Sequence, residues 1–201
     1  LARVVHSLSG RKGPLVTANL ASIPAAQIEG VLFGDGDRDG VLTQAAGGTL
    51  FLDELGEISP TTQARLLGAL TDQQLRADES TEVRLLCATL HDLHSMVQAG
   101  RFRADLYSRI AGFEVRIPPL RARREDLGIL CRGILVGPRA GVPARLSTRA
   151  FRRITEYSWP YNVRELSQTL MTATILAGGE ADIPRLQHHY ATAANMTDAV
   201  A

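Results

Sequence analysis

Two neighbouring carboxylates, Asp53 and Glu54, follow a short apolar run in the stretch TLFLDELGE. Such a run is typical of a buried strand, and the interior of a strand does not tolerate unpaired acids, so the pair is expected at the strand's carboxyl end. Ligands of open α/β sheets bind at that end. One acid there can hold Mg²⁺, usually through water, while its neighbour polarises a water that attacks a phosphate. The stretch is therefore a Walker B candidate, although an acidic loop that merely follows a strand would have the same pattern.

The composition indicates a globular protein with no strongly charged surface. Of the 201 residues, 45% are hydrophobic, which is enough for a sizeable core, and the formal net charge of +1 gives no reason to expect a nucleic-acid-binding surface. The two cysteines, Cys87 and Cys131, stand in apolar runs without metal-ligand spacing, so we expect reduced core cysteines. The sequence shows no membrane-spanning stretch and no features of a secretory signal, so we expect a soluble, cytoplasmic protein.

Short apolar runs separated by helical patterns predict an α/β fold. We expect four strands, at 14–20, 48–55, 83–90 and 113–120, and helices over 1–9, over 23–34 and after Ser59. Ser59 followed by Pro60 is a typical helix start, because serine caps the helix and proline needs no amide hydrogen at the first position. Strands that are apolar throughout favour a parallel sheet covered by helices on both faces.

From about residue 120 onward the patterns are helical only. Ser147 and Asn162 are predicted helix caps, and Asn162 with Glu165 has the spacing of a capping box. We therefore expect an α/β domain at 1–120, a small helical domain at 121–190 and a frayed tail at 191–201.

Five sequence blocks in a fixed order carry a resemblance to a known family. The blocks are GGTLFLDELGEISPTTQARLLGAL, VRLLCATLHDL, GRFRADLYSRI, IPPLRARREDLGIL and WPYNVRELSQTL. Together they resemble the AAA+ module of bacterial sigma-54-dependent transcription activators, the NtrC-like enhancer-binding family, over about 1–185. The resemblance implies a parallel-sheet AAA+ core of the P-loop type followed by an all-helical lid. It also implies ATP and Mg²⁺ as cofactors and self-association through the AAA+ subunit interface.

The resemblance implies roles for three residues at the predicted sheet edge. Asp53 matches the Walker B acid that binds the metal and cofactor, and Glu54 matches the acid that positions water. Asn19, in PLVTANL, matches an asparagine that holds the catalytic glutamate when the nucleotide state changes. The alternative for Asn19 is an ordinary hydrogen-bonding residue at a strand end.

Three arginines also have counterparts in the family. Arg103 and Arg109, in FRADLYSR, match the arginine fingers offered to the γ-phosphate of a neighbouring subunit, where a guanidinium fork suits the developing charge. Arg164, in NVREL, matches the lid arginine that binds and senses nucleotide. A structural alternative stays open for the first two, because they flank Asp105 and could form surface ion pairs with it.

The chain departs from the family at the phosphate-binding loop. A Walker A loop needs G-x-x-x-x-G-K-[ST], and the only lysine, Lys12, stands in SGRKGP with the wrong glycine spacing. In the family, this loop and the central strand before it precede the helix that residues 1–9 resemble. We therefore expect that the natural polypeptide extends upstream; a rearranged or four-stranded sheet is the alternative.

Both family loops that serve the sigma-54 contact are reduced. The GAFTGA loop is absent, because VLFGDGDRDGVLTQAAGGTLF runs almost directly from one helix into the Walker B strand. The second projecting loop, between TDQQLRADES and VRLL, is short. We expect that this chain does not remodel sigma-54.

Two single positions differ from the family as well. Leu90 replaces the sensor asparagine, and a leucine side chain cannot hydrogen-bond a γ-phosphate or a water. His91, next to it, could substitute, but a solvent-exposed histidine at a strand end is the simpler interpretation. Tyr161 replaces the glycine of WPGNVREL, and it would strain the backbone if that position required a positive φ.

The matches and departures together predict a degenerate sigma-54-activator-like AAA+ regulatory module of a bacterial transcription or signalling protein, with weak or no ATP hydrolysis. The alternative is an active ATP-hydrolysing AAA+ regulator whose P-loop lies upstream. A helix-turn-helix in LSTRAFRRITEYSWPYNVRELSQTLM is a third hypothesis. Because the family match makes this segment the lid, we expect no direct DNA binding by the chain.

Overall fold

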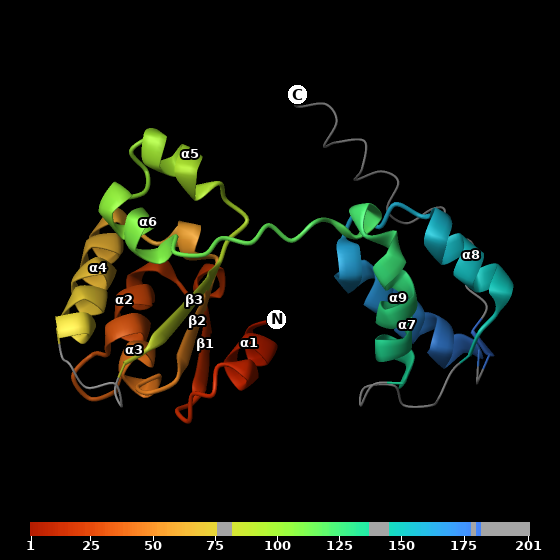
Figure 1. Cartoon of the computed structure of the whole chain (residues 1–201), viewed down its shortest axis with the longest axis horizontal. Helices are drawn as coiled ribbons and strands as arrows, with labels where there is room; N and C mark the ends of the chain where they lie inside the picture. The colour runs from red at the N-terminus through yellow and green to blue at the C-terminus, as the bar shows by residue number, and fades with distance from the viewer. Residues whose placement is uncertain (76–81, 137–144, 178–179, 182–201) are drawn as a thin grey trace. The chain divides into compact units, whose positions relative to one another are not determined.

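The computed structural model describes residues 1–75, 82–136, 145–177 and 180–181 (Figure 1). The chain divides into two compact units between Glu114 and Val115, near the boundary expected at residue 120. Two predicted features lie outside the described residues: the frayed tail at 191–201 and the reduced second loop at 76–81, before VRLL.

Three parallel strands form the sheet of the first unit. They are β1 (Leu15–Asn19), β2 (Thr49–Asp53) and β3 (Arg84–Ala88), in the order β1-β2-β3. The ladder aligns Asn19 with Asp53 and Asp53 with Ala88, so all three strands end at the same edge. Three of the predicted strands and their parallel direction are therefore confirmed.

Helices on one face of this sheet enclose the core of the first unit. They are α2 (Ala25–Phe33), α3 (Val41–Gln44), α4 (Pro60–Leu75), α5 (Leu93–Gln98) and α6 (Ala104–Ile110), with 3-10 turns at Leu20–Ser22 (η1) and Leu55–Glu57 (η2). Leu50 and Leu52 of β2 are fully buried in the same cluster as Leu32 of α2 and Leu66 of α4. The predicted cap of α4 is present, because the amide of Thr62 donates to Ser59 Oγ at 3.1 Å.

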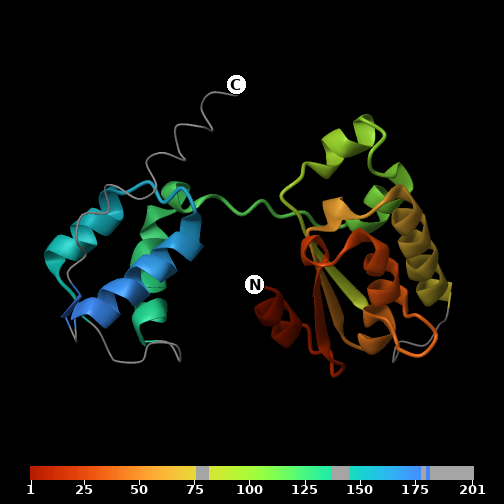
Figure 2. The same cartoon turned by 180° about the vertical axis from the view of Figure 1, so that it is seen from behind.

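The other face of the sheet carries only α1 (Ala2–Leu8) among the described helices, as Figures 1 and 2 show from opposite sides. His6 Nδ1 of α1 lies 2.8 Å from Thr49 Oγ1, but the apolar residues Leu1, Val4 and Leu8 are all exposed. On this second face Thr17 of β1 is exposed as well. The prediction of a sheet with helices on both faces is therefore confirmed only in part, because α1 leaves much of the second face of the described sheet uncovered.

The predicted strand at 113–120 is also wrong. This segment is extended but belongs to no ladder, and Phe113, Val115 and Ile117 are exposed by 89%, 61% and 59%. Pro118 and Pro119 contribute no amide hydrogen, and none of the three described strands pairs with the segment. An apolar pattern favours a strand, but a strand forms only where the segment pairs with another.

The second unit is a small helical domain with a short strand pair. Its helices are α7 (Leu127–Val136), α8 (Thr148–Glu156) and α9 (Asn162–Ala177), preceded by the 3-10 turns η3 (Leu120–Ala122) and η4 (Arg124–Asp126). The two-residue strands β4 (Arg145–Leu146) and β5 (Glu180–Ala181) pair in parallel, so the expectation of helices only is wrong in this detail. Trp159 is fully buried at the centre and donates from Nε1 to the Ile154 carbonyl at 2.8 Å.

The cysteines differ in their surroundings. Cys131 is buried among the apolar residues of α7 and α9, and burial raises the pKa of its thiol to about 11. Cys87, in the edge strand β3, is exposed, so the prediction of a core position is wrong for this residue. An apolar run does not show whether its strand will have a neighbour on each side.

One of the two predicted caps in the second unit is correct. Ser147 Oγ accepts from the amide of Ala150 at 3.1 Å. Asn162 does not complete the predicted capping box: its Oδ1 accepts from the amide of Leu120 at 2.6 Å, and Glu165 Oε2 accepts from the amide of Tyr161 at 3.1 Å. The capping carboxylate therefore reaches one residue further back, and Asn162, at φ 56°, ties α9 to the start of η3.

Within the described parts of the chain, none of the helices has the length and apolar character that crossing a bilayer would require.

Candidate functional site

The structure brings Asn19 and Asp53 together at the carboxyl edge of the sheet. They are the last residues of the neighbouring strands β1 and β2, and Asn19 Nδ2 donates to Asp53 Oδ2 at 3.2 Å. Asp53 is half-buried and Asn19 is exposed. In this structure the asparagine amide thus contacts the first acid of the pair rather than Glu54, the residue that the resemblance gave it as a partner.

Glu54 leaves the strand in a left-handed conformation, with φ 59° and ψ 48°. A non-glycine residue in this region costs about 1 kcal/mol, so the surrounding contacts must hold it there. Its Oε2 accepts from the backbone amide of Leu90 at 3.1 Å. The Leu90 side chain is 90% exposed, so this position contributes its main chain to the site and not its side chain.

A second pair lies beside this contact. His91 Nε2 is 2.9 Å from Glu57 Oε1, with both side chains about half exposed, and the His91 amide donates to Thr89 Oγ1 at 3.0 Å. The exposure of His91 agrees with the interpretation that it is a solvent-exposed histidine at a strand end. The sequence analysis did not predict its partner, Glu57. Glu57 stands three residues after Glu54, and this spacing in DELGE was the available signal.

The two predicted arginine fingers lie at the two ends of α6. Arg103 forms a two-point ion pair with Asp105, Nε to Oδ1 at 3.0 Å and Nη2 to Oδ2 at 2.7 Å, and this hydrogen bonding lowers the pKa of Asp105. Arg109 donates from Nη2 to the Leu70 carbonyl at 3.2 Å. The surface ion pair that the spacing allowed is thus present for Arg103, while Arg109 binds the main chain of α4.

A buried glutamine that sequence reasoning missed positions this segment. Gln63 of α4 is fully buried, and its Nε2 donates to the carbonyls of Ile58 and Arg101 at 3.0 and 3.1 Å. Its Oε1 accepts from the amide of Arg103 at 2.9 Å. A glutamine within a helical run gives no signal of such distant partners.

Lys12 and the acids lie at opposite ends of the parallel strands. It precedes the amino end of β1, whereas Asp53 stands at the carboxyl end of the parallel strand β2. This lysine therefore cannot act as a Walker A lysine next to Asp53, as its glycine spacing already indicated.

The acids at the sheet edge form no complete metal cage. Among the residues that the structure describes, no group of three or more His, Cys, Asp or Glu side chains could hold a metal ion. Mg²⁺ is commonly bound through one or two carboxylates together with waters and substrate phosphates, so a single half-buried Asp53 fits such an ion only when a phosphate accompanies it.

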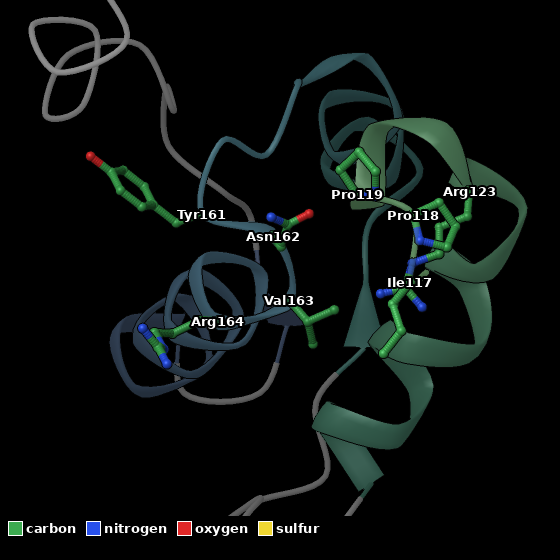
Figure 3. A pocket seen from close by; sticks show the side chains of 8 residues that line it. All are labelled: Ile117, Pro118, Pro119, Arg123, Tyr161, Asn162, Val163 and Arg164. Carbon is green, nitrogen blue, oxygen red and sulfur yellow. The ribbon is translucent and has the colours of Figure 1, made fainter. Parts of the chain in front are cut away.

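An open cavity of about 440 Å³ lies in the second unit (Figure 3). Residues from the segment before η3 and from the start of α9 line it: Ile117, Pro118, Pro119, Arg123, Tyr161, Asn162, Val163 and Arg164. Figure 3 shows Tyr161 and Arg164 pointing away from Ile117 and Pro118, so the predicted lid arginine stands at the rim.

Arg123, one of the residues that line this cavity, has a buried donor without a partner in the described structure. Its Nε is buried without a hydrogen-bond partner in the described structure, and one Nη lies 3.8 Å from Asp126. Leaving a buried donor unpaired costs about 1–3 kcal/mol. Sequence reasoning missed Arg123, because the three arginines of RARR in IPPLRARRED look alike in the sequence.

Tyr161 is not strained at its position. The positive φ values near it belong to Trp159, at 52°, and Asn162, at 56°. The glycine of the family is therefore not required at residue 161 in this structure, and the concern raised by the sequence does not apply.

Comparison with known protein families identifies both units. Residues 1–116 match the family described as Sigma-54 interaction domain, and residues 121–200 match the AAA+ ATPase lid domain. These two matches together cover more than half of the chain.

Similar curated proteins are bacterial regulators. The Nif-specific regulatory protein of Azospirillum brasilense is 40% identical over 190 residues, which are 86% of this chain and 30% of that protein. The transcriptional regulatory protein ZraR of Escherichia coli is 38% identical over 200 residues, or 90% of this chain and 45% of ZraR. The chain thus spans less than half the length of these relatives.

Solved structures agree with these matches. NtrX from Brucella abortus in complex with ATP has a TM-score of 0.75 and 34% identity, over 90% of this chain and 45% of NtrX. The complex of the same protein with ADP has a TM-score of 0.76 and 34% identity, over 92% of this chain. The α/β core with a helical lid is accordingly the AAA+ arrangement that the sequence predicted.

Proposed function

The chain belongs to the sigma-54 interaction domain family, and we propose on this premise that it is a degenerate AAA+ regulatory module of a bacterial, cytoplasmic transcription or signalling protein. In this proposal it does not remodel sigma-54, and it hydrolyses ATP weakly or not at all. The similarity to the transcriptional regulatory protein ZraR and the response regulator protein PilR supports a role in regulation.

The observation that carries the proposal is the closed turn between α2 and α3. Gly34 and Asp39 form an antiparallel bridge, and the amide of Asp35 donates to the Arg38 carbonyl at 3.4 Å. A Cβ on Gly34, which has φ 89°, would lie 2.5 Å from the Arg38 carbonyl oxygen, so the turn is tightly closed. A segment folded back on itself at this point has no length left to project towards a partner.

Weak hydrolysis is supported by the contacts of the acids. Glu54 is held by the main chain of Leu90, which has no side-chain group for a phosphate or a water. Arg103 is already occupied by Asp105, so an interaction with a neighbour's phosphate would require this ion pair to open. The ion pair is exposed, and such pairs are weak, so the opening is not prohibitive.

Nucleotide binding remains part of the proposal. Asp53 would hold Mg²⁺ jointly with phosphate oxygens, and Arg164, at the rim of the cavity in the lid, would contact a nucleotide. The bound Mg²⁺ would supply charge neutralisation on the phosphates. NtrX, in the same family, binds ATP and ADP, which supports the assignment of this ligand class.

The second candidate function is an active ATP-hydrolysing regulator whose P-loop lies upstream. The specific observation in its favour is the gathering of Asn19, Asp53 and Glu54 at one sheet edge. In that case Glu54 would orient water, and Arg103 and Arg109 would serve a neighbouring subunit.

The proposal is tested on the chain by titrating a fluorescent ATP analogue with Mg²⁺, by measuring phosphate release, and by measuring sigma-54 binding through fluorescence anisotropy. We expect weak nucleotide binding, little turnover and no sigma-54 binding. Turnover that Glu54→Gln abolishes and the matched surface variant Glu156→Gln leaves intact would establish the active ATPase instead. Sigma-54 binding by the chain would refute the proposal that this chain does not remodel sigma-54.

Self-association and DNA binding are tested separately. A solution mass measured with and without nucleotide shows whether subunits assemble, as arginine fingers acting between subunits require. Retention of DNA at low salt that disappears in Arg152→Ala would contradict our expectation of no direct DNA binding.

A further inference from the structure

Two loops at the carboxyl edge of the sheet are joined by three contacts. The loop Glu54–Glu57 follows β2, and the loop Thr89–His91 follows β3. Leu90 donates its amide to Glu54 Oε2 at 3.1 Å, and His91 Nε2 lies 2.9 Å from Glu57 Oε1. The third contact is steric, because the His91 ring lies directly over Gly56. We call this set of contacts the loop clasp.

The steric contact shows that the histidine ring is closely fitted to the loop. A Cβ added at Gly56 would lie 2.6 Å from Cδ2 and 3.1 Å from Cγ of His91. A side chain at residue 56 would require the His91 ring to move from its present position. Gly56 also lies between Glu54 and Glu57, so the ring packs on the short segment that connects the two acids.

The turn that carries His91 is itself held in place. The His91 amide donates to Thr89 Oγ1 at 3.0 Å, and Thr89 directly follows the last residue of β3. The imidazole and the Leu90 amide are therefore presented together from one end of the sheet. A shift of His91 would move the Leu90 amide with it, because the two residues are adjacent.

We propose that His91, acting through Glu57, is the positioning residue that keeps the Glu54 carboxylate on the Leu90 amide. In this role the loop clasp replaces a polar side chain at residue 90, which this chain lacks. The backbone of Glu54 is in the left-handed region, so it needs external contacts to persist. The inference rests on the proposed function only in that Glu54 is the acid that would face a nucleotide.

The test is hydrogen exchange of the Leu90 amide in the whole chain, measured by NMR without nucleotide. A hydrogen bond to a charged acceptor protects an amide by a factor of about ten or more, so we expect about tenfold faster exchange in Glu54→Ala. His91→Ala and Glu57→Ala should each accelerate exchange by several fold, and their double variant should add little. His91→Gln, which retains a donor near the position of Nε2, should restore protection.

A matched control is His94→Ala. His94 is an exposed histidine of α5 whose ring lies 3.1 Å from Gln98 Nε2, away from the clasp contacts. This variant should leave Leu90 exchange unchanged, and all single variants should keep the midpoint of thermal unfolding within about one degree. A general loss of stability would accelerate the amides of β2 and β3 together and would not be rescued by His91→Gln.

The result that overturns the inference is unchanged Leu90 exchange in His91→Ala, or equal acceleration in His91→Ala and His91→Gln. Nucleotide titration of the same proteins keeps the two proposals apart. If the Leu90 amide responds as expected but no nucleotide binds, the positioning role of His91 stands and the proposed function fails. If nucleotide binds but the exchange rate of the Leu90 amide is unchanged in His91→Ala, the proposed function stands and the positioning role fails.

Discussion

Glu165 at the start of α9 offers a demanding test of the second unit. It is buried, with 5% of its surface exposed, and accepts two hydrogen bonds: from the Tyr157 hydroxyl at 2.9 Å and from the Tyr161 amide at 3.1 Å. Substitution by alanine leaves both donors without this acceptor. Hydrogen bonds to a charged group contribute about 1.5–3 kcal/mol each, so we expect Glu165→Ala to lower the free energy of unfolding of this unit by about 3 kcal/mol or more.

The assay is urea unfolding followed by tryptophan fluorescence. Trp159 is the only tryptophan in the chain, and it is fully buried with its ring 5.0 Å from that of Tyr157, so its emission reports on this unit. Glu165→Gln retains one acceptor and should lose about half as much. Tyr157→Phe removes one bond, and its effect should largely disappear in the Glu165→Ala background.

A loss below about 1 kcal/mol in Glu165→Ala would refute this reasoning, because no buried hydrogen bond to the carboxylate would then have been broken. Additive effects of Tyr157→Phe and Glu165→Ala would show that the two residues do not interact.

Three further outcomes are expected. Arg103→Ala should raise the pKa of Asp105 towards its ordinary value of 3.8, which an NMR titration would follow. Because both groups are exposed, the same variant should leave the unfolding midpoint at neutral pH unchanged. An unchanged Asp105 titration would contradict the ion pair. Cys131 should resist a thiol reagent at pH 8 until denaturant is added, since burial raises the pKa of this thiol to about 11, and rapid native-state labelling of Cys131 would contradict its place in the core. Ser147→Ala should destabilise the second unit by about 1 kcal/mol in the same urea assay, because the amide of Ala150 loses its cap. The control is Ser167→Ala, at a partly exposed position of α9 that caps no helix, and it should be nearly neutral.

Local patterns in the sequence were sufficient for most elements of the fold. The apolar runs around Leu50 and Leu85 became parallel strands, and Ser59 and Ser147 cap the helices that they were predicted to cap. These features depend on neighbours within a few residues, so they can be recognised without knowing the rest of the chain. The failure at 113–120 has the converse cause, because a strand also needs a distant partner.

The candidate site divides in the same way. Residue types and motif order identified Asp53, Glu54 and Asn19, and the parallel register brought the first and last of these within hydrogen-bonding distance. The register alone could not tell which acid the asparagine would contact.

The tertiary structure alone decided the contacts between residues far apart in the sequence. The Leu90 amide donates to the Glu54 carboxylate, and every residue except proline has such an amide. The Asn162 side chain accepts from the amide of Leu120 and does not cap its own helix. Within the described part of the chain, Arg123 Nε is buried without a hydrogen-bond partner only because of the packing around it. The residue type does not show which partner a backbone amide will have or which side-chain atoms will be buried. These contacts therefore follow from the folding of the whole chain and not from any sequence motif.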